Sequence, residues 1–197
     1  MYNKRRVVYI IAGVLVLLII YSVVTYNSLV TKEEKMKLQW AEVQNTYQRR
    51  LDLIPNLVNV VKGVSGFEQG TLVQIAEARA RALSGLSNTE LTADNYKKQS
   101  DLQDSLAASA NRVIITIENY PALKGTAAYS GLQTQLVGTE RRIKFARKDF
   151  NEAVADYNKK VRSFPSSFVA GMTGFKKKEG FAAEPGSDKA VEINFKK

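Results

Sequence analysis

The uncharged run from Val7 to Tyr26 constrains this chain more than any other feature. It reads VVYIIAGVLVLLIIYSVVTY, twenty residues without an acidic or basic side chain. At about 1.5 Å per residue a helix of this length spans roughly 30 Å, the thickness of a bilayer's hydrocarbon core. Its three tyrosines lie toward the ends, where aromatic rings favour the membrane interface. We therefore predict a transmembrane helix over residues 7–26, preceded by a basic tail over residues 1–6.

A cleaved signal peptide is the alternative interpretation of this segment. The start Lys4-Arg5-Arg6 suits a signal, but the apolar stretch is longer than a signal core and no small-residue cleavage site follows it. We therefore expect the anchor to be retained. Basic residues crowd the short N-terminal tail, whereas Glu33 and Glu34 dilute the lysines of the opposite flank. The positive-inside tendency then predicts a cytoplasmic N-terminus and a domain on the other side of the membrane.

Behind the anchor, apolar residues recur every three or four positions, which is the period of an amphipathic helix. The first stripe consists of Met36, Trp40, Val43, Tyr47, Leu51, Ile54, Val58 and Val61. No breaker precedes it, so we expect the transmembrane helix to run on as a stalk into a folded domain. Pro55 interrupts the pattern, because proline removes one helical hydrogen bond and clashes with the carbonyl of Leu51. We expect a kink or a break there.

Three further helical stripes follow, and no segment combines a strand period with hairpin turns. Ser87-Asn88-Thr89-Glu90 has the pattern of a capping box and predicts the start of the third of the four helices. The fold class expected is all-α, with an N-terminal transmembrane helix continuing into an antiparallel, up-and-down, roughly four-helix bundle. We place this bundle at residues 27–164. An aromatic and basic tail, partly disordered, is expected over residues 165–197.

The chain contains no cysteine and no histidine. This excludes disulfides, zinc sites of the usual kind, cysteine nucleophiles and histidine acid–base chemistry. We expect no catalytic residues, no cofactor and no metal, and hence no enzyme. The net charge of +10 raises the possibility of nucleic-acid binding. Acidic residues are interleaved with the basic ones, however, so attraction to anionic lipid headgroups is favoured over nucleic acid.

Asp52, Pro55 and Asn56 form the most distinctive polar stretch. The structural interpretation is that Pro55 sets a bend and its polar neighbours satisfy the backbone groups that it frees. The functional interpretation is that Asp52 and Asn56, four residues apart on one helical face, form a polar spot for a partner. The structural interpretation is favoured.

Two other segments are candidate lipid or partner surfaces. The first is a basic helical run, whose alternative role is an ordinary solvated face. The second is the aromatic and basic tail, which suits a membrane interface or a partner protein, or packs back on the bundle. The residues concerned are Arg141, Arg142, Lys144, Arg147 and Lys148 in the run, and Phe168, Phe175, Lys176, Lys177 and Lys178 in the tail.

A set of short motifs in a fixed order extends over nearly the whole chain. They are Tyr26-Asn27-Ser28-Leu29-Val30, Arg50-Leu51-Asp52-Leu53-Ile54-Pro55-Asn56-Leu57-Val58, Val61-Lys62-Gly63, Glu77-Ala78-Arg79-Ala80, Tyr120-Pro121-Ala122-Leu123-Lys124, Glu140-Arg141-Arg142-Ile143, Ala146-Arg147, Tyr157-Asn158, Phe164-Pro165 and Gly174-Phe175. In these motifs the chain resembles the LemA family of bacterial membrane proteins. One departure is Phe150-Asn151, where the family pattern has a Tyr-Asn pair.

The resemblance implies a single-pass protein with an antiparallel helical bundle, and it implies no agreed biochemical activity. It also suggests a membrane metalloprotease as one protein partner, by association of genes. From the residues we expect a non-enzymatic, membrane-anchored scaffold or adaptor of the bacterial cell envelope that binds protein partners through its bundle and tail. The alternative is a membrane-surface protein that binds anionic lipid and organises or bends the bilayer.

Overall fold

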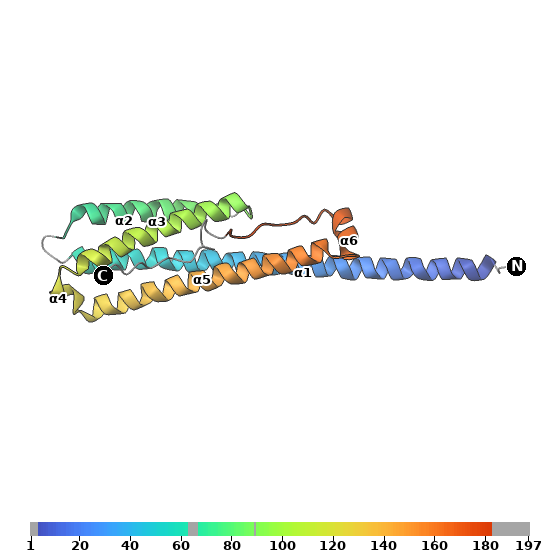
Figure 1. Cartoon of the computed structure of the whole chain (residues 1–197), viewed down its shortest axis with the longest axis horizontal. Coiled ribbons are helices and arrows are strands. Elements are labelled where there is room, and N and C mark those ends of the chain that lie inside the picture. The colour runs from blue at the N-terminus through green and yellow to red at the C-terminus, as the bar shows by residue number, and fades with distance from the viewer. Residues whose placement is uncertain (1–3, 63–66, 89, 183–197) are drawn as a thin grey trace, which may run out of the picture.

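A single long helix organises the molecule. The structure, a computed structural model, describes residues 4–62, 67–88 and 90–182. Helix α1 (Lys4–Lys62) comprises 59 residues without interruption, a length of about 88 Å at 1.5 Å per residue. It begins at the N-terminal end, passes through the whole predicted span and continues along the entire bundle (Figure 1).

The other helices fold back along the distal two-thirds of α1. They are α2 (Gln69–Leu86), α3 (Ala93–Ile117), the short α4 (Pro121–Lys124), the long α5 (Ala127–Arg162) and α6 (Ser166–Thr173). Helix α5 runs antiparallel to α1 and makes the most extensive contact with it, while α2 and α3 form a hairpin that lies against the far half of α1 (Figure 1). No strand occurs in these described ranges. The expected all-α fold, a helix continuing from the span into an antiparallel bundle, is confirmed.

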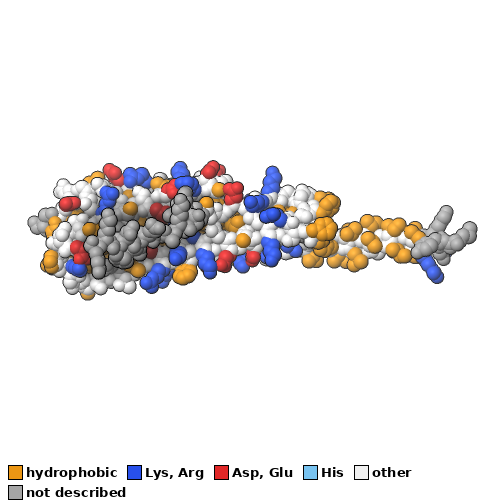
Figure 2. Space-filling model, in the orientation of Figure 1, with side chains coloured by type: hydrophobic (Ala, Val, Ile, Leu, Met, Phe, Trp, Pro, Cys, Tyr) orange, Lys and Arg blue, Asp and Glu red, His pale blue; other side chains and the backbone are white. Residues whose placement is uncertain are grey.

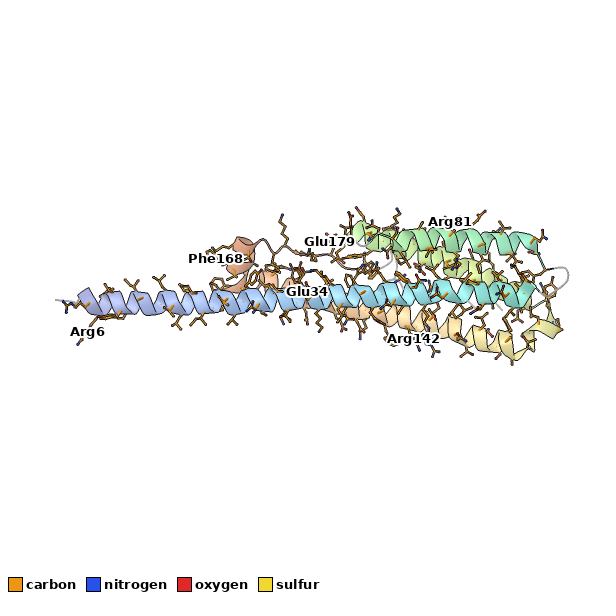
Figure 3. The ribbon with its side chains drawn as sticks, turned by 180° about the vertical axis from the view of Figure 1, so that it is seen from behind. Arg6, Glu34, Arg81, Arg142, Phe168 and Glu179 are labelled. Carbon is orange, nitrogen blue, oxygen red and sulfur yellow. The ribbon has the colours of Figure 1, made fainter. Side chains whose placement is uncertain are left out.

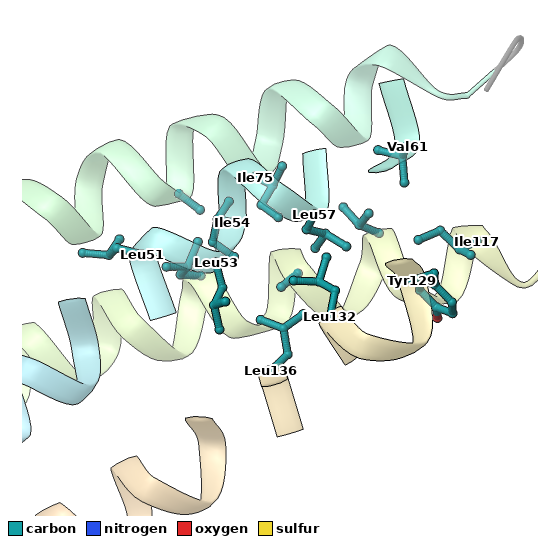
Figure 4. Packing of buried hydrophobic residues seen from close by; sticks show 14 of the residues in the cluster. Leu51, Leu53, Ile54, Leu57, Val61, Ile75, Ile117, Tyr129, Leu132 and Leu136 are labelled. Atoms are coloured by element: carbon teal, nitrogen blue, oxygen red, sulfur yellow. The ribbon is translucent and has the colours of Figure 1, made fainter. Parts of the chain in front are cut away.

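The core is divided into three parts along the axis of the molecule. The part farthest from the span is aliphatic and brings together Leu51, Ile54 and Leu57 of α1 with Ile75 of α2 and Leu132 of α5 (Figure 4). The middle part is aromatic. The part nearest the span is small and joins α1, α5 and α6. Burying large aliphatic side chains stabilises the fold by about 1.5–3 kcal/mol for each, so the stripes predicted from spacing are the main stabilising feature.

Two sequence-based expectations about helix ends differ from the structure. Helix α1 continues through Pro55, so a break there is excluded, whereas a kink stays a prediction. Helix α3 begins at Ala93, because Thr92 is its N-cap: the Thr92 side chain accepts a hydrogen bond from the amide of Asn95 at 3.3 Å. The predicted capping box at Ser87 therefore lies before the turn that precedes α3 rather than at its start. The expected disorder beyond residue 182 falls outside the described residues.

The transmembrane helix runs on into the folded domain, as expected, and packing against the other helices begins at the end of the span. Thr25 and Leu29 are already buried, at 1% and 0% exposure. Leu29 packs against Tyr157 and Val161 of α5 and against Ala170 of α6. The bundle therefore starts where the apolar span ends, with no bare helix between them.

Candidate functional site

The apolar half of α1 has no protein cover among the described residues. Its large side chains between Val8 and Val24 are between 36% and 67% exposed, except Tyr9 at 74%. An apolar helix bare in water would be unstable, because each side chain left uncovered forgoes its burial energy. Among the helices of the described residues, α1 is the one that is long and apolar enough to cross a bilayer. These observations support a single-pass membrane protein.

The backbone carbonyl that Pro55 leaves without a helical donor has a partner from another helix. Proline has no amide hydrogen, so the carbonyl of Leu51, four residues earlier, loses its helical donor. Arg79 on α2 supplies the replacement: its Nε donates to the Leu51 carbonyl oxygen at 3.0 Å. The sequence interpretation looked for this partner among the neighbours of Pro55. A guanidinium from α2 fills the role instead, because it reaches the acceptor from the side on which α2 packs.

Asp52 and Asn56 both lie on the surface of α1. Asp52 Oδ1 accepts a hydrogen bond from Gln48 Nε2 at 2.7 Å, one turn earlier on the same helix. Asp52 also lines a shallow groove together with Arg142 of α5. The structure thus brings together two residues from separate sequence predictions, Asp52 and Arg142, whereas Pro55 is half-buried and does not line this groove.

This groove belongs to a longer surface, which we call the α1–α5 seam. It runs along the line where the two helices meet on the solvent side. Its residues are Lys35, Gln39, Glu42, Asn45, Arg49 and Asp52 on α1, and Arg142, Asp149, Glu152 and Asp156 on α5. Leu38 and Phe145 fall in the same stripes by helical spacing, and they are 66% and 60% exposed. The seam is therefore a mixed-charge surface with two bare apolar side chains.

The predicted basic run does not lie on one surface. Arg141, Arg142, Lys144 and Lys148 are exposed on α5. Arg147 turns inward instead: its Nε donates to the Tyr47 hydroxyl at 2.9 Å, and its Nη2 reaches Asp104 Oδ1 at 3.3 Å. Burial raises the pKa of the Tyr47 phenol, so that group stays neutral beside Arg147. Arg147 therefore ties α1, α3 and α5 together.

Arg50 is a buried polar residue that sequence analysis missed. It is 2% exposed, and its Nη1 donates to the Gln103 carbonyl of α3 at 2.8 Å. Its Nη2 lies 2.6 Å from Glu140 Oε2 of α5. Burial lowers the pKa of this guanidinium, and Glu140 opposes that shift. Helical spacing could have indicated this burial, since Arg50 lies three residues after Tyr47 and four before Ile54, inside the apolar stripe.

The tail after α6 packs back on the bundle through two asparagines of α5. Asn158 exchanges two hydrogen bonds with the backbone of Lys178, at 2.7 and 2.9 Å. Asn151 does the same with the backbone of Phe181, at 3.2 and 2.8 Å. Asparagines seven residues apart on a helix lie about 10.5 Å apart. Extended residues three apart are separated by about 10 Å, so the two spacings match and the tail is held by its backbone.

Each of these asparagines follows an aromatic residue that points into the core. Phe150 is 0% exposed, as is Tyr157, whose hydroxyl also donates to the Lys176 carbonyl at 3.0 Å. The pairs Phe150-Asn151 and Tyr157-Asn158 therefore share one arrangement: the aromatic side chain packs in the core, and the asparagine side chain binds the backbone of the tail. The replacement of tyrosine by phenylalanine at 150 leaves this arrangement intact.

Phe181 completes the aromatic part of the core. Its ring centroid lies 5.9 Å from Trp40, 5.7 Å from Tyr96 and 5.7 Å from Phe150. Among the predicted tail residues, Phe175 packs edge-on against Tyr26, and Lys178 lies 3.7 Å from Glu33. Phe168 remains 70% exposed, and Lys176 and Lys177 are also exposed. The structure thus divides the tail into packed and solvent-facing members.

None of the described Asp and Glu side chains gathers in a group of three or more that could hold a metal ion. The fold and these surfaces define a class: single-pass membrane proteins whose membrane helix continues into an all-α antiparallel bundle. The chain belongs to the LemA family, whose model matches residues 39–195.

The chain is similar to proteins of two kinds. Magnetosome protein MamQ 2 of Paramagnetospirillum magneticum is 25% identical over 184 residues, which cover 84% of this chain and 68% of that protein. Magnetosome protein MamQ of Magnetospirillum gryphiswaldense is 26% identical with the same coverage. Protein LemA of Metamycoplasma hominis is 23% identical over 144 residues, covering 73% of this chain and 63% of that protein.

Proposed function

We propose that the protein is a non-enzymatic scaffold of the bacterial cell envelope that holds protein partners at a set distance from its membrane. The observation that carries this proposal is the continuity of α1, one helix from the apolar span to the far end of the bundle. A continuous helix packed along α5 transmits the position of the anchor to every surface above it.

The α1–α5 seam is the partner surface that we propose. Its two bare apolar side chains, Leu38 and Phe145, lie among charges of both signs. Exposed apolar residues ringed by charge are typical of protein contacts, because the apolar centre supplies affinity and the charged rim supplies selectivity. Counted along α1 from Tyr26, Leu38 stands about 18 Å and Asp52 about 39 Å beyond the span. A partner on the seam is thereby held within this range of the bilayer.

Site-specific photocrosslinking in intact cells tests this role. A photoreactive amino acid at position 145 is expected to give discrete protein adducts, and Leu38→Ser should remove them because it takes away half of the apolar contact. The matched control is the same photoreactive residue at position 115, since Ile115 is 67% exposed on α3. Identical adducts at 145 and 115, or adducts that survive Leu38→Ser, would rule out the seam as the partner surface. A membrane metalloprotease is one partner to look for among the adducts.

We propose further that the N-terminus lies in the cytoplasm and the bundle outside it. The three basic residues at positions 4–6 support this orientation. The chain has no cysteine, so Ile115→Cys provides a unique thiol on the exposed bundle. A membrane-impermeant maleimide is expected to label it in intact cells, after permeabilisation of any outer membrane. Labelling that requires disruption of the inner membrane would reverse the orientation.

A further inference from the structure

Helix α6 is apolar on the side that faces the bundle and on the side that faces away. Its sequence, SSFVAGMT, carries no charge. Val169 and Ala170 pack inward and are 7% and 1% exposed. Phe168 and Met172 point outward and are 70% and 75% exposed, and Phe164, just before the helix, is 90% exposed. A helix that is apolar all round is normally covered on both sides, so the outer face of α6 requires a cover.

The position of α6 indicates what that cover is. Phe175, directly after the helix, packs against Tyr26, the last residue of the apolar span, with ring centroids 5.7 Å apart. Ala170 packs against Leu29, one turn further along α1. Orange apolar side chains gather on the end of the bundle from which the span emerges (Figure 2). Phe168 lies on this side of α6, facing the N-terminal half of α1 (Figure 3).

The direction of α6 suits a membrane surface. The helix lies across the long axis of α1 rather than along it (Figure 1). When α1 crosses a bilayer, a helix set across it at the end of the span lies close to the plane of the interface. The side chains of Phe164, Phe168 and Met172 are then directed at the boundary between headgroups and acyl chains.

Cationic side chains stand directly behind this apolar surface. Lys159, Arg162 and Lys177 line one groove together with Asn158 and Ser163, at the junction of α5 and the tail. Within the described part of the chain these three cations have no ion-pair partner, whereas nearby Lys32 and Lys178 pair with Asp156 and Glu33. Cations behind inserted apolar residues match the order of layers in a bilayer, with anionic phosphates outside the acyl chains.

We propose that α6 and this groove form a membrane-contact foot. Phe164, Phe168 and Met172 insert into the interface of the same bilayer that α1 crosses, and Lys159, Arg162 and Lys177 bind the phosphate of anionic lipid. The bilayer is the occupant, because the covalent continuity of α1 places it against α6 in every molecule. A second contact beside the span stops the bundle from tilting on a single helix. The foot is independent of partner binding on the seam.

Fluorescence of the full chain in lipid nanodiscs tests the apolar half of the foot. Met172→Cys and the control Ile115→Cys each give one thiol for an environment-sensitive dye, with phosphatidylcholine and phosphatidylglycerol in equal parts as the bilayer. The dye at 172 is expected to emit at shorter wavelength and to be quenched by lipids carrying a nitroxide at a shallow acyl position. The dye at 115 should show neither effect. Water-like emission at 172 would overturn the proposal, and so would a blue shift without lipid quenching, which indicates a second copy or a partner.

The groove is tested with the same dye at position 172. Nitroxide-labelled phosphatidylglycerol should quench it at a mole fraction lower than that of labelled phosphatidylcholine by a factor of at least about five, the ratio that a single one of the three cations provides. Replacing all three groove cations by glutamine should abolish this preference, and Lys97→Gln with Lys98→Gln, near the start of α3 and beside the middle part of the core, should leave it unchanged. Equal quenching by the two lipids in the parent chain would refute a groove for anionic lipid.

Discussion

The Nε of Arg79 donates to the carbonyl oxygen of Leu51, the one acceptor in α1 that Pro55 deprives of its helical donor. Leu51 is 0% exposed, so this carbonyl has no access to water and depends on the guanidinium. The contact fixes α2 against α1 at one register. It also connects two motifs that lie far apart in the sequence, the segment around Pro55 and the segment around Arg79.

Arg79→Ala is expected to lower the free energy of unfolding by about 1–3 kcal/mol, because it leaves a buried carbonyl without a donor. Pro55→Ala should reverse most of this loss, since an alanine amide donates to the Leu51 carbonyl within the helix. Denaturant unfolding of the full chain in detergent, carried out as a double-mutant cycle, measures the coupling.

Arg81→Ala is the matched control for this cycle. Arg81 lies on the same helix but is exposed, with an ion pair to Glu77 at 3.7 Å. Its removal should change stability by no more than about 0.5 kcal/mol. Equal losses for Arg79→Ala in the presence and absence of Pro55 would contradict the pairing, because the two residues would then act independently.

Arg50 is expected to tolerate no replacement that keeps only its charge. Arg50→Lys should cost about 2–3 kcal/mol, because one ammonium cannot span the Gln103 carbonyl and Glu140 as the planar guanidinium does. Arg50→Met, which is apolar and of similar length, should cost less than Arg50→Lys, since it leaves no buried charge poorly paired. Thermal unfolding of both variants gives the order, and a lysine variant as stable as the parent would contradict it.

Because the phenol of Tyr96 is buried, we expect the protein to lose stability at alkaline pH. Burial raises the pKa of Tyr96 to about 12, against about 10 in an unfolded chain. Between these values the unfolded phenol has lost its proton while the folded one keeps it, so rising pH favours unfolding. The stability contributed by this group is complete below about pH 10, and on the order of 2–3 kcal/mol is lost by about pH 12.

Tyr96→Phe should flatten this alkaline decline, as measured by denaturant midpoints across the pH range. The variant should also be at least as stable as the parent near neutral pH, because the Tyr96 hydroxyl is buried without a hydrogen-bond partner among the described groups. An unchanged alkaline slope in the phenylalanine variant would assign the decline to other groups.

The docked tail is expected to come off when its two asparagines are lost. Asn151→Ala with Asn158→Ala removes the four backbone hydrogen bonds to Lys178 and Phe181. Phe181 then leaves the ring of Trp40, the sole tryptophan of the chain. We expect a red shift of tryptophan fluorescence and faster amide exchange over residues 176–181, with the helices unaffected. Ser167→Ala on α6, outside the contacts of Asn151 and Asn158, serves as the control. An unshifted spectrum in the double variant would contradict this docking of the tail.

The α-helical fold was largely predictable. The apolar stripe of α1 from Met36 to Val61 is a local property, and its spacing predicted burial that the structure bears out for Trp40, Tyr47 and Leu51. A break at Pro55 was one of two expected outcomes, and the structure excludes it because Arg79 of α2 supplies the missing donor. Arg50 was missed for a related reason, since a charged residue inside an apolar stripe is acceptable only when partners from other helices surround it.

The amino-acid sequence by itself determined the apolar span and the helical periods, and it excluded cysteine and histidine chemistry. Each of these depends only on composition or on neighbours within a few helical turns. Tertiary structure decided which residues meet across helices. It turned Arg147 inward, placed the tail on Asn151 and Asn158, and brought α6 to the end of the span beside Tyr26. These contacts join positions up to 149 residues apart along the chain, the separation between Tyr26 and Phe175. The register between α1 and α5 determines them, and no local pattern encodes that register.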